Sequence, residues 1–237
     1  MQANSSGGQQ PQPAPATPVR RAPRNAPPQF QAERLLKMDA AGLIAVLKNP
    51  KSTEFEKAKA CQFLASKGGA DAVPALAALL TDPKLSHYGR YGLEPNPDPS
   101  AGDALRAALP RVKGGLLVGV VNSLGARKDV KAVAPLAKLL SGADAEAARA
   151  AAWALGQISG PEAAKALQDG LARTKGSVQE AVADGCLRCA EGLLAQGQRD
   201  RALALYSALT GPAIPKPARL AAMHGIIAAE ISLSRPR

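Results

Sequence analysis

The sequence contains few of the side chains on which enzyme chemistry usually depends. It has two histidines, three cysteines and one tryptophan, and aromatic residues make up only 3% of the 237-residue chain. The short motifs that mark a serine nucleophile, a zinc-binding histidine pair or a glycine-rich phosphate loop are all missing. The sequence therefore gives no support for catalysis, and we expect a protein that is not an enzyme, with no catalytic residue, no bound metal and no cofactor.

Two of the three cysteines, Cys186 and Cys189, form a C-x-x-C pair inside a stretch that is predicted as one helix. A redox pair usually gains its low pKa at a helix N-terminus beside a strand, and the sequence predicts neither feature here. A zinc site would need two more ligands at a suitable spacing, and none follow. We therefore expect both thiols, like Cys61, to be small buried hydrophobic residues, although spacing alone leaves the role of the pair open.

Long apolar runs are also missing, because no segment reaches 18 apolar residues and the first residues lack the apolar stretch of a secretory signal. The sequence as it stands predicts a cytoplasmic protein without a membrane span. A chain whose signal had been removed would look the same, so export to the periplasm stays an alternative. No run of alternating Val, Ile and Thr predicts strands, and the dominance of alanine and leucine indicates an all-α protein.

What the chain does have is pairs of leucines four residues apart that recur at nearly constant intervals. The six pairs are Leu43/Leu47, Leu76/Leu80, Leu105/Leu109, Leu136/Leu140, Leu167/Leu171 and Leu205/Leu209. Their first members are 33, 29, 31, 31 and 38 residues apart, and a period in this range indicates stacked repeats. Residues i and i+4 lie on one face of a helix, so each pair marks one helix turned toward a shared core.

A second column of apolar residues keeps almost the same period, which predicts two helices in each repeat. Its members are Leu64, Leu93, Leu124, Leu155, Leu187 and Ile226. We expect an all-α, right-handed superhelix of about six helix pairs over residues 36–232. Residues 1–35, rich in Pro, Gln and Ala, are expected to be a disordered tail, and residues 233–237 a short C-terminal tail.

The clearest repeat is the segment 131–161. Asp144 is the expected N-cap of its second helix, and Gly160-Pro161 is expected to close that helix and open the next. Residues 145–167 resemble most closely the HEAT-like repeats of the short bacterial type, as found in phycobilin lyases, and the resemblance extends over about residues 38–230. The residues that carry this resemblance are Arg149, Ala151, Ala152, Ala154, Leu155, Gly156 and Ile158.

The stretches 86–109 and 184–197 are also similar to HEAT-repeat segments of planctomycete and verrucomicrobial proteins. In that group such arrays often stand beside a separate catalytic or haem-binding domain, so this chain could be a module of a larger protein. The resemblance implies architecture and little about activity, because the fold hosts many unrelated roles. Neither His87 nor His224 is followed by the glutamate that marks di-iron HEAT-repeat hydroxylases.

The formal net charge of +11 raises the possibility of a polyanionic partner. Residues 111–141 hold six basic residues and one acidic residue, which makes this the most basic part of the predicted repeats. The candidate anion patch comprises Arg106, Arg111, Lys113, Arg127, Lys128 and Lys131. A solvated basic surface is the alternative, because stacking aromatics are missing from 106–131 and Trp153, inside a predicted helix, is expected to be a packing residue.

The one irregular segment, 86–100, is predicted to contain a shortened helix that ends before Pro95, Pro97 and Pro99. Loops that interrupt repeats often carry recognition. The candidate partner surface here comprises His87, Tyr88, Arg90, Tyr91 and Glu94. The alternative is local packing, in which Tyr88 or Tyr91 fills space beside Gly89 and Gly92.

Three classes of function follow from these patterns. The favoured one is a non-catalytic scaffold that binds a protein partner on the inner surface lined by the second helices. The alternative is a binder of nucleic acid or another polyanion through the basic cluster. A repeat-built lyase or glycosylase comes third, and no residue supports it. The oligomeric state is left open.

Overall fold

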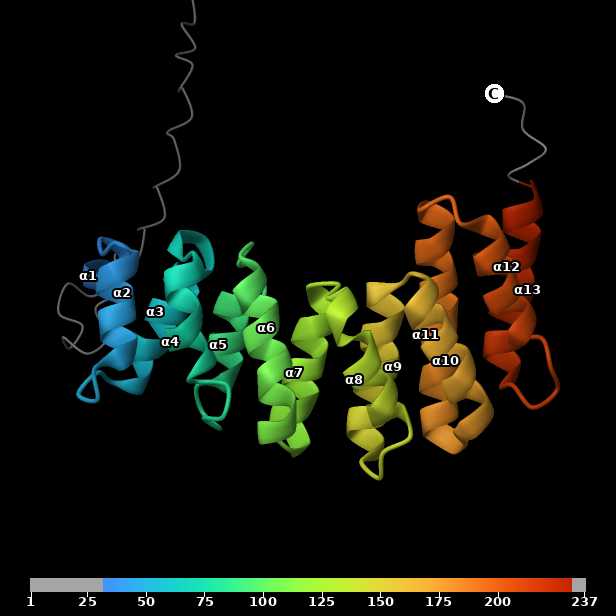
Figure 1. Cartoon of the computed structure of the whole chain (residues 1–237), viewed down its shortest axis with the longest axis horizontal. Helices are drawn as coiled ribbons and strands as arrows, with labels where there is room; N and C mark the ends of the chain where they lie inside the picture. Colours follow the sequence, from blue (N-terminus) through green and yellow to red (C-terminus); the bar gives the residue numbers. More distant parts are fainter. Residues whose placement is uncertain (1–31, 232–237) are drawn as a thin grey trace, which may run out of the picture.

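The computed structural model describes residues 32–231, and within this range the chain forms thirteen α-helices and no strand. The α-helices are α1 (Ala32–Leu36), α2 (Ala40–Lys48), α3 (Glu54–Lys67), α4 (Val73–Ala77), α5 (Ser86–Leu93), α6 (Pro99–Ala108), α7 (Gly114–Ala126), α8 (Val133–Leu140), α9 (Ala145–Ile158), α10 (Pro161–Arg173), α11 (Gly176–Ala195), α12 (Arg199–Ala208) and α13 (Lys216–Ile231). Short 3-10 turns precede α4 and α8 and follow α6. The helices stand side by side in one row from α1 to α13 (Figure 1).

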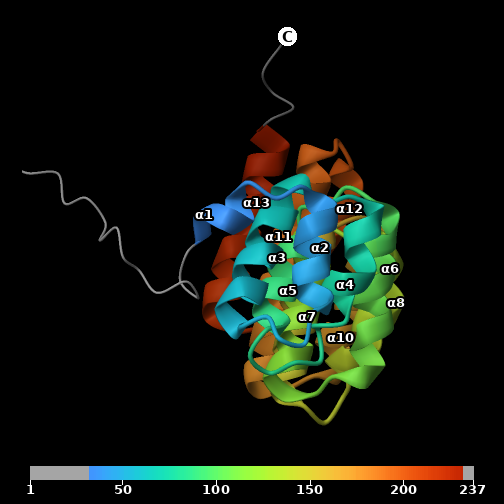
Figure 2. The same cartoon turned by 90° about the vertical axis from the view of Figure 1, so that its left-hand side faces the viewer.

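The row is built from six helix pairs, α2–α3 through α12–α13, as the two residue columns predicted. Figure 2, which looks along the row, shows the first helices α2, α4, α6 and α8 on one side and the second helices α3, α5, α11 and α13 on the other. The all-α repeat architecture is therefore confirmed. Each pair buries its apolar faces against its neighbours instead of around a single centre.

The predicted boundary at residue 36 falls within the first helix that the structure describes. Helix α1 begins at Ala32, and its Leu35 is buried in the core against the first repeat. The remaining predictions for the two tails fall on residues 1–31 and 232–237, which lie outside the described residues.

The leucine pairs form the core as expected. Eleven of their twelve members are buried, and only Leu109, at the C-terminal end of α6, is half-buried. The second column holds from Leu64 to Leu155 but fails at Leu187 and Ile226, which are half-buried. Cys186, which follows Leu155 by 31 residues, takes the fully buried place instead. The core position in α11 is therefore the residue 31 positions after Leu155, and it is not the neighbouring leucine, Leu187.

The predicted helix ends are also found. The Asp144 carboxylate accepts hydrogen bonds from the backbone N–H groups of Glu146 and Ala147, at 3.0 and 3.1 Å, and so caps α9. Gly160 adopts a φ of 96°, a left-handed conformation that favours glycine, and Pro161 is the first residue of α10. Helix α10 therefore begins directly after α9, with only Ser159 and Gly160 between them.

The second helices in the C-terminal half approach one another closely. A Cβ added at Gly185 of α11 would lie 2.6 Å from the carbonyl oxygen of Ala152 in α9, so no side chain can be placed there without moving backbone. Gly156 of α9 faces Gly185 in turn, and Gly125 of α7 faces Ala154. Helices α7, α9 and α11 therefore form one tightly packed block.

Candidate functional site

The irregular segment lies next to this block and forms helix α5. The helix ends at Leu93, before the three prolines, as predicted, and Pro99 serves as the first residue of α6. The five residues proposed here as a partner surface separate into two groups. The side chains of His87 and Tyr91 are exposed, whereas Tyr88 is half-buried against the core. Arg90 and Glu94 turn toward α7.

Arg90 fits into a gap in α7 that is left by Gly119. A Cβ at Gly119 would lie 2.7 Å from the guanidinium carbon, so only glycine permits this contact. The Nη1 atom of Arg90 donates to the Gly119 carbonyl at 3.3 Å and to the Ser123 hydroxyl at 3.4 Å. Burial lowers the pKa of Arg90, and the nearby Glu94 carboxylate opposes that change. Arg90 therefore joins two repeats and is not a free recognition residue.

Glu94 and Arg127 complete the junction between α5 and α7. The Ser123 hydroxyl donates to the Glu94 carboxylate at 2.6 Å. Arg127, just beyond α7, donates from Nη1 to the carbonyl oxygens of Leu93, Glu94 and Asn96, at 2.6, 2.9 and 2.6 Å. These carbonyls lie at and beyond the C-terminus of α5, where no further backbone N–H group of the helix is present to donate to them. The α5–α7 junction is thus held by polar side chains, in contrast to the close backbone packing of α7, α9 and α11.

The alternative in which a tyrosine fills the space beside Gly89 and Gly92 does not match the structure. The space beside the two glycines is already filled, because a Cβ added at either one would contact Leu76, Leu79 or the backbone of Cys61. Tyr88 packs on the core beside them, and Tyr91 points outward with 51% of its surface exposed. Three of the five candidate residues, Tyr88, Arg90 and Glu94, therefore make contacts within the array, and His87 and Tyr91 are left exposed.

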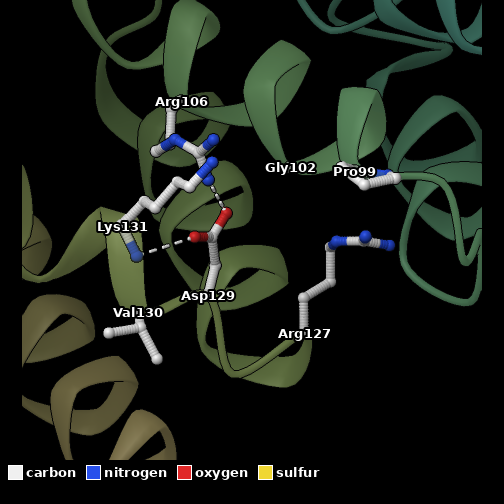
Figure 3. A pocket seen from close by; sticks show the side chains of 7 residues that line it. All are labelled: Pro99, Gly102, Arg106, Arg127, Asp129, Val130 and Lys131. Atoms are coloured by element: carbon white, nitrogen blue, oxygen red, sulfur yellow. Dashed lines mark hydrogen bonds and ion pairs between the residues drawn. The ribbon is translucent and has the colours of Figure 1, made fainter.

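The basic cluster is divided in a similar way. The Arg106 guanidinium forms ion pairs with the carboxylates of Asp129 and Asp103. Figure 3 shows Arg106 and Lys131 beside Asp129, while Arg127 points away from them. The backbone N–H of Lys131 donates to the second Asp129 oxygen at 3.0 Å. In this open hollow of about 290 Å³, the protein's own carboxylate occupies the place where an external anion would bind Arg106.

Four exposed cations of the cluster remain: Arg111, Lys113, Lys128 and Lys131. They do not form one concentrated patch, because the first two precede α7 and the last two follow it. Helix α7 has 13 residues, which corresponds to a length of about 20 Å at 1.5 Å per residue. The structure therefore brings together two separate pairs of basic residues and not the single patch that the sequence suggested.

Trp153 was expected to be a packing residue, and the structure shows that 36% of its surface is exposed. One edge of the indole lies against Gly125 of α7, where a Cβ would approach it to 2.9 Å. Trp153 precedes Leu155 by two residues, and Tyr91 and Asn122 precede Leu93 and Leu124 by the same number. The three residues therefore occupy equivalent positions on α9, α5 and α7. This shared position is the sequence signal that could have identified Trp153.

One helical turn earlier, a second row lies on the same face of these helices. The positions four residues before Tyr91, Asn122 and Trp153 are His87, Val118 and Arg149, and each is at least partly exposed. Arg149 is paired with Glu146 at 2.7 Å. We call these six residues the α5–α9 face. It combines two exposed aromatic rings, an amide and one neutralised cation.

The cysteines are buried, as predicted. Cys61, Cys186 and Cys189 are all free thiols in the core. Burial raises the pKa of Cys61 and Cys186 to about 12 and that of Cys189 to about 11. The thiolate form, which is the reactive one, is therefore strongly disfavoured at neutral pH. Among residues 32–231, no group of three or more His, Cys, Asp or Glu side chains is arranged to hold a metal ion.

Comparisons with known proteins agree with this architecture. Residues 115–185, from α7 into α11, match the family described as HEAT repeats. The matched segment contains the residues, from Arg149 to Ile158, that carry the HEAT-like resemblance in the sequence. None of the helices within the described range has the length and apolar character needed to cross a membrane. No curated protein matches the chain.

Three solved structures are similar at a lower level. An engineered protein shares 20% identity over 80% of this chain and 97% of its own, with a TM-score of 0.46. A second engineered protein shares 22% identity over 80% of this chain and 58% of its own, with a TM-score of 0.45. Human deoxyhypusine hydroxylase, solved in complex with glycerol, shares 17% identity over 84% of this chain and 99% of its own, with a TM-score of 0.44.

Proposed function

We propose that this chain is a non-catalytic protein-binding module and that the α5–α9 face holds an extended segment of its partner. The observation that supports this proposal is the exposure of Tyr91 and Trp153 at equivalent positions two repeats apart. Exposed Tyr and Trp side chains are among those that most often dominate the energy of protein interfaces. The polar α5–α7 junction holds α5, which carries Tyr91, against α7.

The spacing of the face suits a segment that runs across the helices. Neighbouring packed helices lie about 8–10 Å apart, and three residues of extended chain also span about 10 Å. A partner crossing from α5 to α9 would therefore place about every third residue over successive repeats. The amide of Asn122, between the two rings, can both donate to and accept from a peptide backbone. The partner would contribute two apolar side chains about six residues apart.

A displayed library of random peptides, selected against the full chain, tests the proposal. We expect Tyr91→Ala and Trp153→Ala each to weaken the selected peptides by about tenfold or more, as for interface residues worth over 1–2 kcal/mol. Val130→Ala is the matched control, because Val130 is also exposed but lies outside the face. Equal affinity for all three variants would contradict the proposed surface.

The same experiment distinguishes the polyanion alternative. Its second arm replaces the four exposed cations Arg111, Lys113, Lys128 and Lys131 with alanine. Binding to a polyanion depends steeply on salt, because phosphate contacts release counterions. The polyanion function would be favoured if a ligand no longer bound this variant, no longer bound at 0.5 M salt, and still bound the Tyr91 and Trp153 variants with full affinity. We expect the opposite pattern, because Arg106 and Arg127 already have partners within the protein.

A further inference from the structure

The last helix, α13, is apolar on two faces. Its small residues Ala218, Ala222 and Ala229 are buried, and Gly225 lies against the ring of Tyr206 in α12. The opposite face carries larger side chains that are exposed to solvent. Leu220, Met223 and Ile227 have 52%, 46% and 54% of their surface exposed. The helix therefore packs its inner face through small side chains and leaves these three large ones uncovered.

The three exposed residues form one stripe, because spacings of three and four place side chains on the same face of a helix. A second helix inside the array, such as α9, is covered on both sides by α7 and α11. Terminal repeats of stable arrays normally present a polar outer face to water. Within residues 32–231, the outer face of α13 resembles an internal helix without its next neighbour.

We propose that a second copy of this chain covers this stripe, with the two α13 helices packed antiparallel about a two-fold axis. The central part of the stripe, from Leu220 to Ile227, is symmetric about the point between Met223 and His224, and Ile231, with 56% of its surface exposed, lies one turn beyond it. Antiparallel pairing at that centre places Leu220 of one copy against Ile227 of the other, and the two Met223 side chains near the axis. A surface that matches itself in this way is what an isologous dimer requires.

The charges on α13 favour the same orientation. Lys216 lies at the start of the helix and Glu230 near its end, and both side chains are exposed. Antiparallel pairing brings Lys216 of one copy beside Glu230 of the other, whereas parallel pairing would place like charges together. The net charge of +11 on each chain opposes association at long range. Salt should therefore strengthen the dimer, because it screens this repulsion and leaves apolar contacts in place.

Sedimentation of the full chain over a concentration series provides the first test. We expect a monomer–dimer equilibrium that shifts toward dimer as salt is raised. Leu220→Glu or Ile227→Glu should weaken the dimer at least tenfold, and Val130→Glu, at an exposed site elsewhere, should leave it unchanged. Lys216→Glu should weaken it several-fold, and adding Glu230→Lys should restore it. A monomer at every concentration, or a charge reversal without rescue, would overturn the proposal.

A cysteine at the axis gives a second measurement. Met223→Cys should form a disulfide-linked dimer on mild oxidation, because antiparallel pairing brings the two positions close together. The three native cysteines are buried and should contribute little background. Val130→Cys is the control for random collision. Cross-linking of both variants at the same rate would show that the stripe does not pair as proposed. All substituted positions are exposed, so unchanged thermal unfolding checks that each variant is folded.

Discussion

Replacing Leu155 with alanine should lower the free energy of unfolding by about 2–5 kcal/mol. Leu155 is fully buried in α9, which is covered on its two sides by α7 and α11. The surrounding backbone is already in close contact at Gly156 and Gly185, so the cavity cannot collapse readily. Urea denaturation followed by circular dichroism measures the effect.

Leu187→Ala is the matched control for this prediction. The leucine spacing in the sequence gave Leu187 the same role as Leu155, but the structure places Cys186 at that position and leaves Leu187 half-buried. We expect Leu187→Ala to lower the free energy of unfolding by only about 1 kcal/mol, within the usual range for partly exposed sites. An equal loss at both positions would mean that the register of α11 described above is incorrect.

Replacing Arg127 with alanine should reduce stability by about 2–3 kcal/mol, although the residue resembles an ordinary surface charge in the sequence. Three backbone carbonyls at and beyond the end of α5 would lose their shared donor. Arg127→Lys should recover part of the loss, because an ammonium is charged but cannot match the planar geometry of a guanidinium. The measurement is the midpoint of urea unfolding.

Arg111→Ala serves as the control for Arg127. Arg111 was assigned to the same basic cluster, but its side chain is exposed. Changes at such positions usually alter stability by less than about 0.5 kcal/mol. If Arg127 acted only as part of an anion-binding surface, both substitutions would be equally mild. A marked difference between them would identify Arg127 as a structural residue.

The repeat architecture could be predicted because it depends on local spacing. Residues such as Leu136 and Leu140 lie on one helix face wherever that helix packs, so a constant period suffices to recognise the array. The prediction of the second core column was wrong in α11, where the leucine was expected at the buried position. Cys186 is a small hydrophobic residue that keeps the 31-residue step, and its larger neighbour Leu187 was chosen in its place.

The surface could not be predicted in the same way, because the partners of its polar residues are distant in the sequence. Arg127 contacts backbone carbonyl groups of residues 31–34 positions earlier. Every residue has a backbone carbonyl, so the identity of the amino acid does not reveal that it is a partner of Arg127. Arg106 is neutralised by Asp129, which is 23 residues away. Trp153 packs with one edge on Gly125, as expected, but 36% of its surface is also exposed. Its place beside alanines suggests burial, whereas its equivalence to Tyr91 indicates an outward direction.

Polar side chains cross the junction between α5 and α7, and in this the junction differs from the contacts that follow it along the array. On its C-terminal side, α7, α9 and α11 meet backbone to backbone, and amide hydrogens there should exchange only on global unfolding. On its N-terminal side, Arg90 and Arg127 link α5 to α7 beside the continuous apolar core, and their hydrogen bonds can reorient without opening that core. We therefore expect the array to bend at α5–α7 first, and the separation of Tyr91 from Trp153 to be its most adjustable dimension.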